Sequence, residues 1–214
     1  MDSRSKILNR LRGERRPFDD VPPVTEPRPM VPVEDQSPEA LLTRFVSEAG
    51  KLESVVTRFS DPQRAIEHVL QLIAPDKAIQ AWDTDHIPLP DLAQALKDAG
   101  IEISPGDAAV RVGLTGAAAA LAGTGSLVLM VGPGRPRQAS LVPPVHIAVI
   151  TAGQIVANLE TWAASHRRND FQAFRNASNT VVISGPSRTG DIANIPVKGV
   201  HGPGTTHIIL LQHL

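Results

Sequence analysis

The chain has 214 residues, of which 42% are hydrophobic and 20% charged, and its formal net charge at pH 7 is −1. This length fits one domain with a good core and leaves no room for a second complete domain. The composition is that of a globular protein, and no apolar run approaches the roughly 18 to 20 residues that span a bilayer. Disorder throughout the chain and a membrane-spanning segment are therefore excluded.

The absence of cysteine and of a secretory signal narrows the possible cofactors and the cellular location. The sequence contains no cysteine, which excludes disulfides, a catalytic thiolate and cysteine-ligated iron–sulfur clusters in this chain. We therefore expect no cofactor of that kind here. Residues 1–16 lack the apolar stretch of about 7 to 15 residues that marks a secretory signal, which indicates a cytoplasmic protein.

Charge is distributed unevenly along the chain. Residues 1–16 carry a net charge of +4, residues 17–103 of −9, and residues 104–214 of +4. The basic C-terminal half favours a small anionic ligand or an acidic partner surface. Nucleic acid is a poor candidate, because there is no long basic tract, no tyrosine, and only five phenylalanines and two tryptophans for stacking.

The N-terminal segment, residues 1–36, is expected to lie outside the main domain. Ser5–Leu11 predicts a short basic helix, and seven prolines between Pro17 and Pro38 then prevent regular structure. This composition is typical of an extended arm or linker. Its length and valines suggest an arm across a surface, such as that of another subunit, whereas disorder is an equally good reading.

Residues 37–214 form the predicted domain, which begins with two helices. Ser37-Pro38 places a capping hydroxyl before proline at the first helical position. Apolar residues recur at helical spacing from Leu41 to Phe59, and we expect one long helix there. Asp61-Pro62 repeats the start signal, and an apolar stripe from Ala65 to Ile73 predicts the second helix.

From Lys77 onward, short strands alternate with helices. We expect an α/β domain with a mixed or mainly parallel sheet and helices on both faces. The alanine-rich segment 115–122 predicts a turn of helix. The expected strands are 78–82, 101–103, 110–114, 127–131, 146–150, 180–183 and 206–211, and the expected helices are 89–99 and 155–165.

Several familiar catalytic signatures are missing. The sequence has no Gly-x-Gly-x-x-Gly dinucleotide turn, no P-loop and no Gly-x-Ser-x-Gly nucleophile elbow. Of the seven histidines, His68 lies on a predicted helix and His146 and His207 on predicted strands, without the spacing of a metal site. We therefore expect no metal centre.

Two polar loops near the C-terminus are the best candidate site. The first, Ser184–Asp191, follows a predicted strand, and the second, Gly199–Pro203, precedes another. Polar groups at strand ends are where open α/β sheets bind ligands. Arg188 is the best anchor for a carboxylate or phosphate, because its planar fork donates two parallel hydrogen bonds.

The residues around Arg188 suggest an anion cradle with an acid or base beside it. Asp191 can orient Arg188 or act as a base, and His201 is the candidate acid or base with a pKa naturally near neutrality. Alternatively, Arg188 and Asp191 form a structural ion pair, and His201 is a turn residue. The anion-binding set comprises Arg188 and also Ser187, Thr189, Thr124 and the backbone near Gly125 and Gly185.

Three motifs in order carry a family resemblance: Thr124-Gly125-Ser126-Leu127-Val128-Leu129, then Gly185-Pro186-Ser187-Arg188-Thr189, then Gly199-Val200-His201-Gly202-Pro203. Over roughly residues 40–214 the chain resembles the lactate-utilisation protein C family, whose shared region is the LUD domain. The resemblance implies a fold related to ribose-phosphate isomerases and CoA-transferases. It also implies a part in oxidising L-lactate to pyruvate beside partner proteins that carry iron–sulfur centres.

The chain departs from the family pattern at two places. Gly123 stands where the family usually has an acidic residue, and Ala193-Asn194 where another acidic residue often occurs. These departures favour a non-redox subunit that binds a small anion and docks with iron–sulfur proteins through the acidic region 17–103 or the arm. Two alternatives remain open. One is a stand-alone enzyme for a phosphorylated sugar, acyl-CoA or hydroxy acid, and the other is a diverged family member with another ligand.

Overall fold

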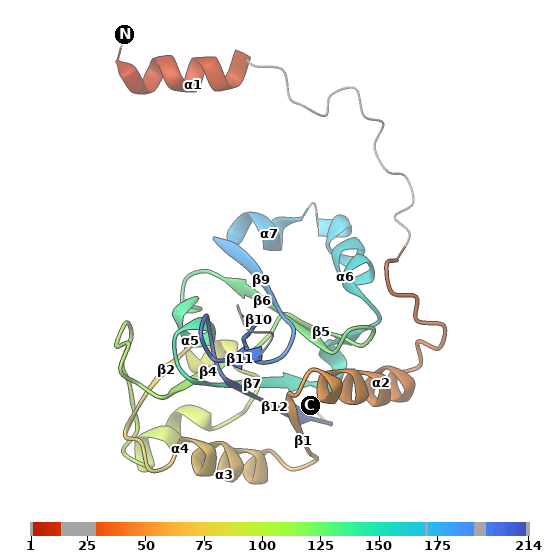
Figure 1. Cartoon of the computed structure of the whole chain (residues 1–214), viewed down its shortest axis with the longest axis vertical. Coiled ribbons are helices and arrows are strands. Elements are labelled where there is room, and N and C mark those ends of the chain that lie inside the picture. Colours follow the sequence, from red (N-terminus) through yellow and green to blue (C-terminus); the bar gives the residue numbers. More distant parts are fainter. Residues whose placement is uncertain (1, 14–28, 170, 191–195, 213–214) are drawn as a thin grey trace.

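Six strands form a parallel sheet through the middle of the protein, and four more form a second sheet beside it (Figure 1). The computed structural model describes residues 2–13, 29–169, 171–190 and 196–212. In the first sheet the strand order is β1-β12-β7-β4-β2-β3, and each neighbouring pair is parallel. Its strands are β1 (Val55–Phe59), β2 (Ala78–Ala81), β3 (Glu102–Ile103), β4 (Val112–Thr115), β7 (Val145–Thr151) and β12 (Thr205–Leu211).

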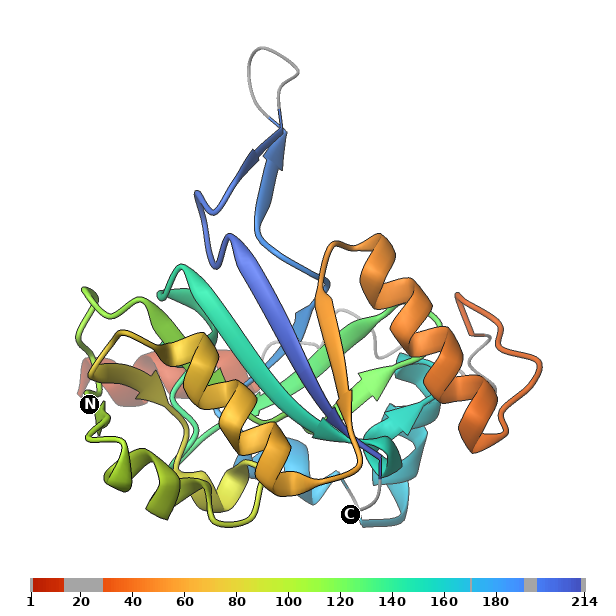
Figure 2. The same cartoon turned by 90° about the horizontal axis from the view of Figure 1, so that it is seen from below.

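The second sheet has the order β8-β5-β6-β9 and is mixed. β6 is antiparallel to both of its neighbours, whereas β5 and β8 are parallel. Two further strands, β10 and β11, form an antiparallel pair that stands out from the body (Figure 2). The bounds are β5 (Ala119–Leu121), β6 (Ser126–Val131), β8 (Ile155–Val156), β9 (Asn179–Ile183), β10 (Arg188–Gly190) and β11 (Pro196–Lys198).

The helices give the molecule its layers, which Figure 1 shows in order from bottom to top. α3 (Pro62–Ile73) and α4 (Leu92–Asp98) cover one face of the first sheet, and the second sheet lies on its other side. α6 (Leu159–Ser165) and α7 (Gln172–Asn176) cover the far face of the second sheet. The remaining elements are α1 (Ser3–Gly13), α2 (Pro38–Lys51) beside both sheets, α5 (Gln138–Leu141) on β4, and the 3-10 turns η1 (Thr84–His86), η2 (Ala152–Gln154) and η3 (His166–Asn169).

Two hydrophobic cores hold these layers together. The main core joins the two sheets to α2, α3 and α4, and Phe45, Leu129 and Ile208 are fully or almost fully buried in it. A smaller core packs Val128 and Met130 against Trp162 of α6. Successive residues of a strand point to opposite faces, so β6 contributes to both cores and is buried along its whole length.

The expected α/β domain with a mainly parallel sheet is confirmed, and the second sheet was not predicted. The long helix expected from Pro38 to Phe59 is wrong, because α2 ends at Lys51 and the chain continues as β1. Glu53 adopts a left-handed conformation, with φ of 64°, which breaks the helix. The β-branched residues that follow it then pair with β12.

The alanine-rich segment 115–122 was expected as helix and forms strand instead. β5 pairs with β6 and β8 there, and its three residues are buried. Cross-strand hydrogen bonds and burial between two cores outweigh the helix propensity of alanine. The helix expected over 155–165 begins only at Leu159, where the Asn158 side chain caps it, since Ile155–Val156 is β8.

Both helix starts expected from proline are present, although only one has the expected cap. Asp61 Oδ1 accepts a hydrogen bond from the Gln63 backbone N–H at 2.9 Å, which caps α3. Ser37 precedes α2 but makes no capping bond through its hydroxyl. Among the described helices, none combines the length and apolarity that crossing a membrane requires.

The stretch 29–36 before α2 packs on the body of the protein. Val33 is buried in the main core, and Val31 lies against Gly123, where an added Cβ would be 3.1 Å from its side chain. The Met30 backbone N–H donates to Glu160 Oε1, and Asn158 donates to the Val31 carbonyl. This part of the predicted arm therefore lies across its own domain.

Candidate functional site

The long connection between β9 and β12 carries most of the predicted site residues. It leaves the body as β10 and returns as β11, the pair that projects in Figure 2. Arg188 begins β10 directly opposite Lys198, the last residue of β11. Two basic side chains from the two strands therefore lie next to each other at the root of this hairpin.

Glu53 is the partner of both basic groups. Arg188 Nη2 lies 2.7 Å from Glu53 Oε1, and Lys198 Nζ contacts Glu53 Oε2. The hydrogen bond from Lys198 and the positive charge of Arg188 lower the pKa of the Glu53 carboxyl below its ordinary value. One carboxylate facing two cations leaves an excess positive charge, which suits a small anion.

Ser187 and His201 are also brought together. The His201 backbone N–H donates to Ser187 Oγ at 3.3 Å, and the Ser187 N–H donates to the Pro203 carbonyl at 2.8 Å. These bonds hold the first predicted loop against the second and leave the His201 side chain exposed. Thr189 lies half-buried one residue beyond Arg188, opposite Val197.

The two predicted glycines pack against the C-terminal end of α2. A Cβ on Gly125 would lie 2.2 Å from the Ala49 backbone nitrogen, and one on Gly185 would lie 2.4 Å from the Leu52 carbonyl oxygen. Both have positive φ, of 66° and 79°, which glycine adopts without strain. Glycine is therefore required at both positions for the close approach of backbones.

The backbone N–H groups of Thr124 and Gly125 are already hydrogen-bonded within their own turn. Both N–H groups donate to the Leu121 carbonyl, at 3.3 Å and 2.8 Å. They are therefore not free to bind an anion, which leaves the exposed Thr124 side chain as the polar group of this turn. Beside it, the hydroxyls of Ser126 and Ser184 lie 2.8 Å apart and tie β6 to the end of β9.

The end of α2 is thus the common neighbour of the predicted residues. It packs on Gly125 and Gly185 and leads into Glu53, which binds Arg188. Asp191, the predicted base, lies outside the described residues, so its role remains a prediction. Arg188 does form an ion pair with a carboxylate, and the partner is Glu53.

Glu53, Lys198 and Ser126 belong to this cluster and were missed by sequence reasoning. Glu53 fell inside a stretch interpreted as helix, so nothing in the pattern placed it at a loop. Lys198 precedes the predicted loop at Gly199, but only the pairing of β10 with β11 sets it beside Arg188. The position of Lys198 directly before the glycine turn was the one feature of the sequence that could have indicated its role.

The cluster lies at the amino ends of the parallel strands. Glu53 precedes β1, and the Gly199–Pro203 loop precedes β12. The loop at Ser184 does follow a strand, but β9 belongs to the second sheet. The usual ligand position of an open parallel sheet, at the carboxyl ends, is therefore a different place.

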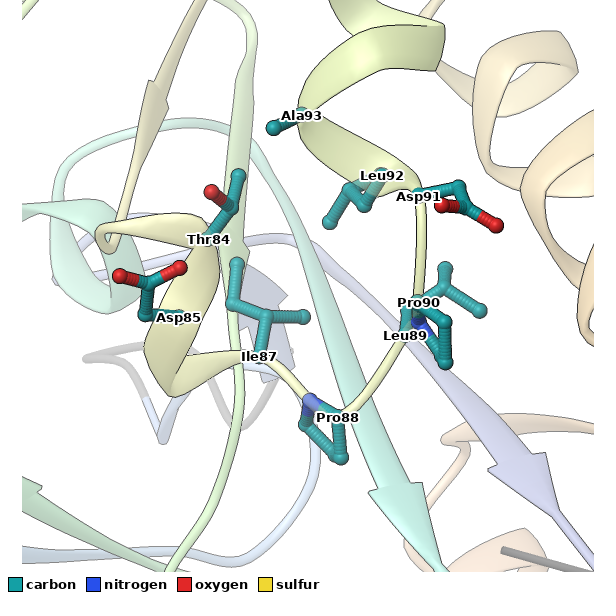
Figure 3. A pocket seen from close by; sticks show the side chains of 9 residues that line it. All are labelled: Thr84, Asp85, Ile87, Pro88, Leu89, Pro90, Asp91, Leu92 and Ala93. Atoms are coloured by element: carbon teal, nitrogen blue, oxygen red, sulfur yellow. The ribbon is translucent and has the colours of Figure 1, made fainter.

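A hollow of about 360 Å³ follows β2 at that carboxyl edge (Figure 3). Ile87, Leu89 and Leu92 line it, and the carboxylates of Asp85 and Asp91 stand beside them. It contains none of the predicted residues, and its acidic groups disfavour an anion. Within the described residues, no three His, Asp or Glu side chains are grouped as a metal site would require.

Comparison with known proteins gives a consistent family. The LUD domain model matches residues 42–211. Lactate utilization protein C of Halalkalibacterium halodurans is 27% identical over 205 residues, which covers 91% of this chain and 86% of that protein. The protein of the same name from Exiguobacterium sp. is 34% identical over 103 residues, and that from Shouchella clausii is 40% identical over 92 residues.

These two shorter matches span only 45% and 40% of the length of the relatives concerned. Among solved structures, a DUF162 family protein from Deinococcus radiodurans superimposes with a TM-score of 0.61 at 21% identity. The superposition covers 84% of this chain and 99% of that one, so the two share a fold. Because the family model covers most of the sequence, the chain belongs to the LUD domain family.

Proposed function

We propose that this chain is a non-redox component of a system that oxidises L-lactate to pyruvate, and that it binds a small carboxylate at Arg188 and Lys198. The observation that carries the role in lactate utilisation is the alignment over 91% of the chain with a lactate utilization protein C. The basic pair at the hairpin root supports the ligand class.

The composition of the chain supports the non-redox part. Oxidation of lactate to pyruvate releases two electrons, and cysteine-ligated iron–sulfur clusters are common carriers for them. These 214 residues contain no cysteine. The electrons therefore pass to partner proteins that hold such clusters, and this chain docks with them.

The chemistry of the hairpin root fits a hydroxy acid or a keto acid. A substrate carboxylate can take two hydrogen bonds from the Arg188 guanidinium, whose side chain is 44% exposed in its pair with Glu53. Lys198 adds a second charge. The Ser187 hydroxyl, which accepts a hydrogen bond from the His201 N–H, is a further polar group of the same loop.

Thermal unfolding with and without ligand tests this site. Lactate or pyruvate should raise the melting temperature of the wild type, because a ligand that binds only the folded state stabilises it. Arg188→Ala should abolish the rise. Lys51→Ala is the matched control, since it removes one exposed basic group at the end of α2 and leaves the Arg188–Lys198 pair intact.

A rise that persists in Arg188→Ala would place the ligand elsewhere. Growth tests the cellular role separately. A strain that lacks the gene should fail to grow on L-lactate, and the wild-type gene should restore growth. Normal growth of the deletion strain would contradict the role even if the purified protein binds lactate.

A second function is a stand-alone enzyme that uses His201 as acid or base. The contact between the His201 backbone and Ser187 favours it, because it places His201 in the loop beside the residue that precedes Arg188 and leaves its side chain exposed to a ligand. The purified chain would then convert lactate with an artificial electron acceptor and no partner protein. Loss of that turnover in His201→Gln, with ligand-induced stabilisation retained, would identify the enzyme.

A further inference from the structure

The helix α1 has an apolar side that none of the described residues covers. None of its eleven residues is buried. Ile7, Leu8 and Leu11 lie on one side of the helix by their spacing, and Ile7 and Leu11 are 61% and 68% exposed. A helix this short is marginal in water unless such a side packs against something.

The outer surface of α6 has a hollow that fits such a helix side. Its volume is about 310 Å³, and Leu159, Ala163, Ala164 and Phe171 supply apolar lining, with Glu160 and Arg167 beside them. Leu159 is 43% exposed and Phe171 38%, which is high for large apolar side chains. The hollow has the chemistry of a docking site for a few aliphatic side chains.

The chain that leads back from α1 arrives at the rim of this hollow. The Met30 N–H donates to Glu160 Oε1 at 2.9 Å, and Glu160 is one of the lining residues. Residues 14–29 separate α1 from this anchor and include five prolines. Sixteen residues reach at most about 55 Å, so α1 can reach any surface close to the hollow.

We propose that α1 docks into the α6 hollow of a second copy of the chain, in a reciprocal exchange of arms. Within its own chain α1 does not fill this hollow, since none of its residues is buried and Leu159 and Phe171 stay exposed. Both arms start at the rims of their own hollows. Two copies that face each other about a two-fold axis therefore place each α1 beside the other copy's hollow.

Engineered cysteines test the exchange cleanly, because the chain has none of its own. The double variant Leu11→Cys/Ala163→Cys is oxidised at low protein concentration and run on a non-reducing gel. We expect a covalent dimer, since each chain cross-links to its neighbour. The pair Leu11→Cys/Arg58→Cys is the control, because Arg58 is exposed on β1, on the first sheet.

Mass measurement by light scattering gives an independent readout. The wild type should be a dimer, and Leu11→Asp and Leu159→Asp should both be monomers with an unchanged circular dichroism spectrum. Asn9→Asp adds the same charge on the opposite side of α1 and should remain a dimer. Three results would each overturn the proposal: a cross-link within one chain, a monomeric wild type, or a dimer that survives Leu11→Asp.

Discussion

His146 lies on β7 with its imidazole fully buried and one nitrogen without a partner. Its Nε2 is 2.9 Å from Thr115 Oγ1, and its Nδ1 makes no hydrogen bond. Burial disfavours the charged ring and lowers the pKa of His146 from 6.5 to about 4. The folded protein therefore keeps this side chain neutral in mildly acidic solution.

The buried His146 predicts a loss of stability in acid. Below pH 6.5 the unfolded chain binds a proton at His146, whereas the folded protein does so only near pH 4. The free energy of unfolding should therefore be greatest above pH 6.5 and fall by up to about 3 kcal/mol between pH 6.5 and 4. Urea unfolding at several pH values measures this slope.

His146→Gln should reduce the slope, because it removes the titrating ring. Part of the slope remains, since burial and the charge of His68 also lower the pKa of His207. Thr115→Val is the matched control: it removes the hydroxyl partner but leaves the ring, so it lowers stability and keeps the slope. An unchanged slope in His146→Gln would contradict this account of the acid sensitivity.

At the level of single residues, the sequence predicted Arg188 as the basic group of the site but did not predict its partner Glu53. Arg188 and Ser187 were identified from their chemistry and their place in a glycine-rich loop, and the Ser187 hydroxyl does accept a hydrogen bond from the His201 backbone. Glu53 is more than 130 residues away in sequence and contacts Arg188 only through the folded hairpin. No local pattern contains such a long-range pairing.

The hairpin of β10 and β11 is joined to the body at its root by two ion pairs to one carboxylate. It pairs with neither sheet, and Glu53 binds both Arg188 and Lys198 at its root. Glu53→Gln removes the negative charge and keeps the shape of the side chain. We expect faster amide hydrogen exchange in both hairpin strands, with little change in the global free energy of unfolding.

Glu48→Gln provides the comparison for the hairpin. It breaks the ion pair with Lys51 at the same end of α2 and does not touch the hairpin. Exchange in β10 and β11 should stay at the wild-type rate in this variant. If Glu53→Gln also exchanged at that rate, the ion pairs would not be what holds the hairpin to the body.

Helices and strands were predictable where the hydrophobic periodicity of the sequence matches the face that is buried in the fold. The apolar stripe of α3 and the β-branched runs of β7 and β12 gave the correct structure, because their periodicity reflects which face is buried. The alanine segment at β5 was misread, since alanine has no periodic contrast and its partners β6 and β8 decide the outcome. The second sheet was missed because β5 and β8 both fell in segments expected as helix, although β6 and β9 were expected as strands.

At the scale of the whole molecule, the segment 29–36 ties the N-terminal region to the domain. Val33 is 7% exposed within the main core, and Val31 packs on Gly123. We expect residues 37–214 to unfold about 2 to 4 kcal/mol more easily than residues 29–214, from the loss of a buried valine and its hydrogen-bonded neighbours. Urea unfolding of the two truncated proteins gives the difference.

Both truncated proteins lack α1, so arm exchange does not affect this comparison. The variant Val33→Ala in residues 29–214 should show part of the same decrease in the free energy of unfolding, because it removes two buried methyl groups. Equal stability of the two truncated proteins would contradict the packing of this segment. The predicted boundary between residues 36 and 37 stays a prediction, although burial of Val33 shows that the packed structure begins earlier.

The position of β12 between β1 and β7 means that β1 acquires its partner strand only late in synthesis. β1 pairs with β12, a partner about 150 residues later in the sequence, and β12 also joins β1 to the rest of the sheet. While the ribosome synthesises the intervening chain, the inner edge of β1 has no neighbour. That edge of the nascent protein therefore stays open to incorrect strand pairing until residues 205–211 emerge.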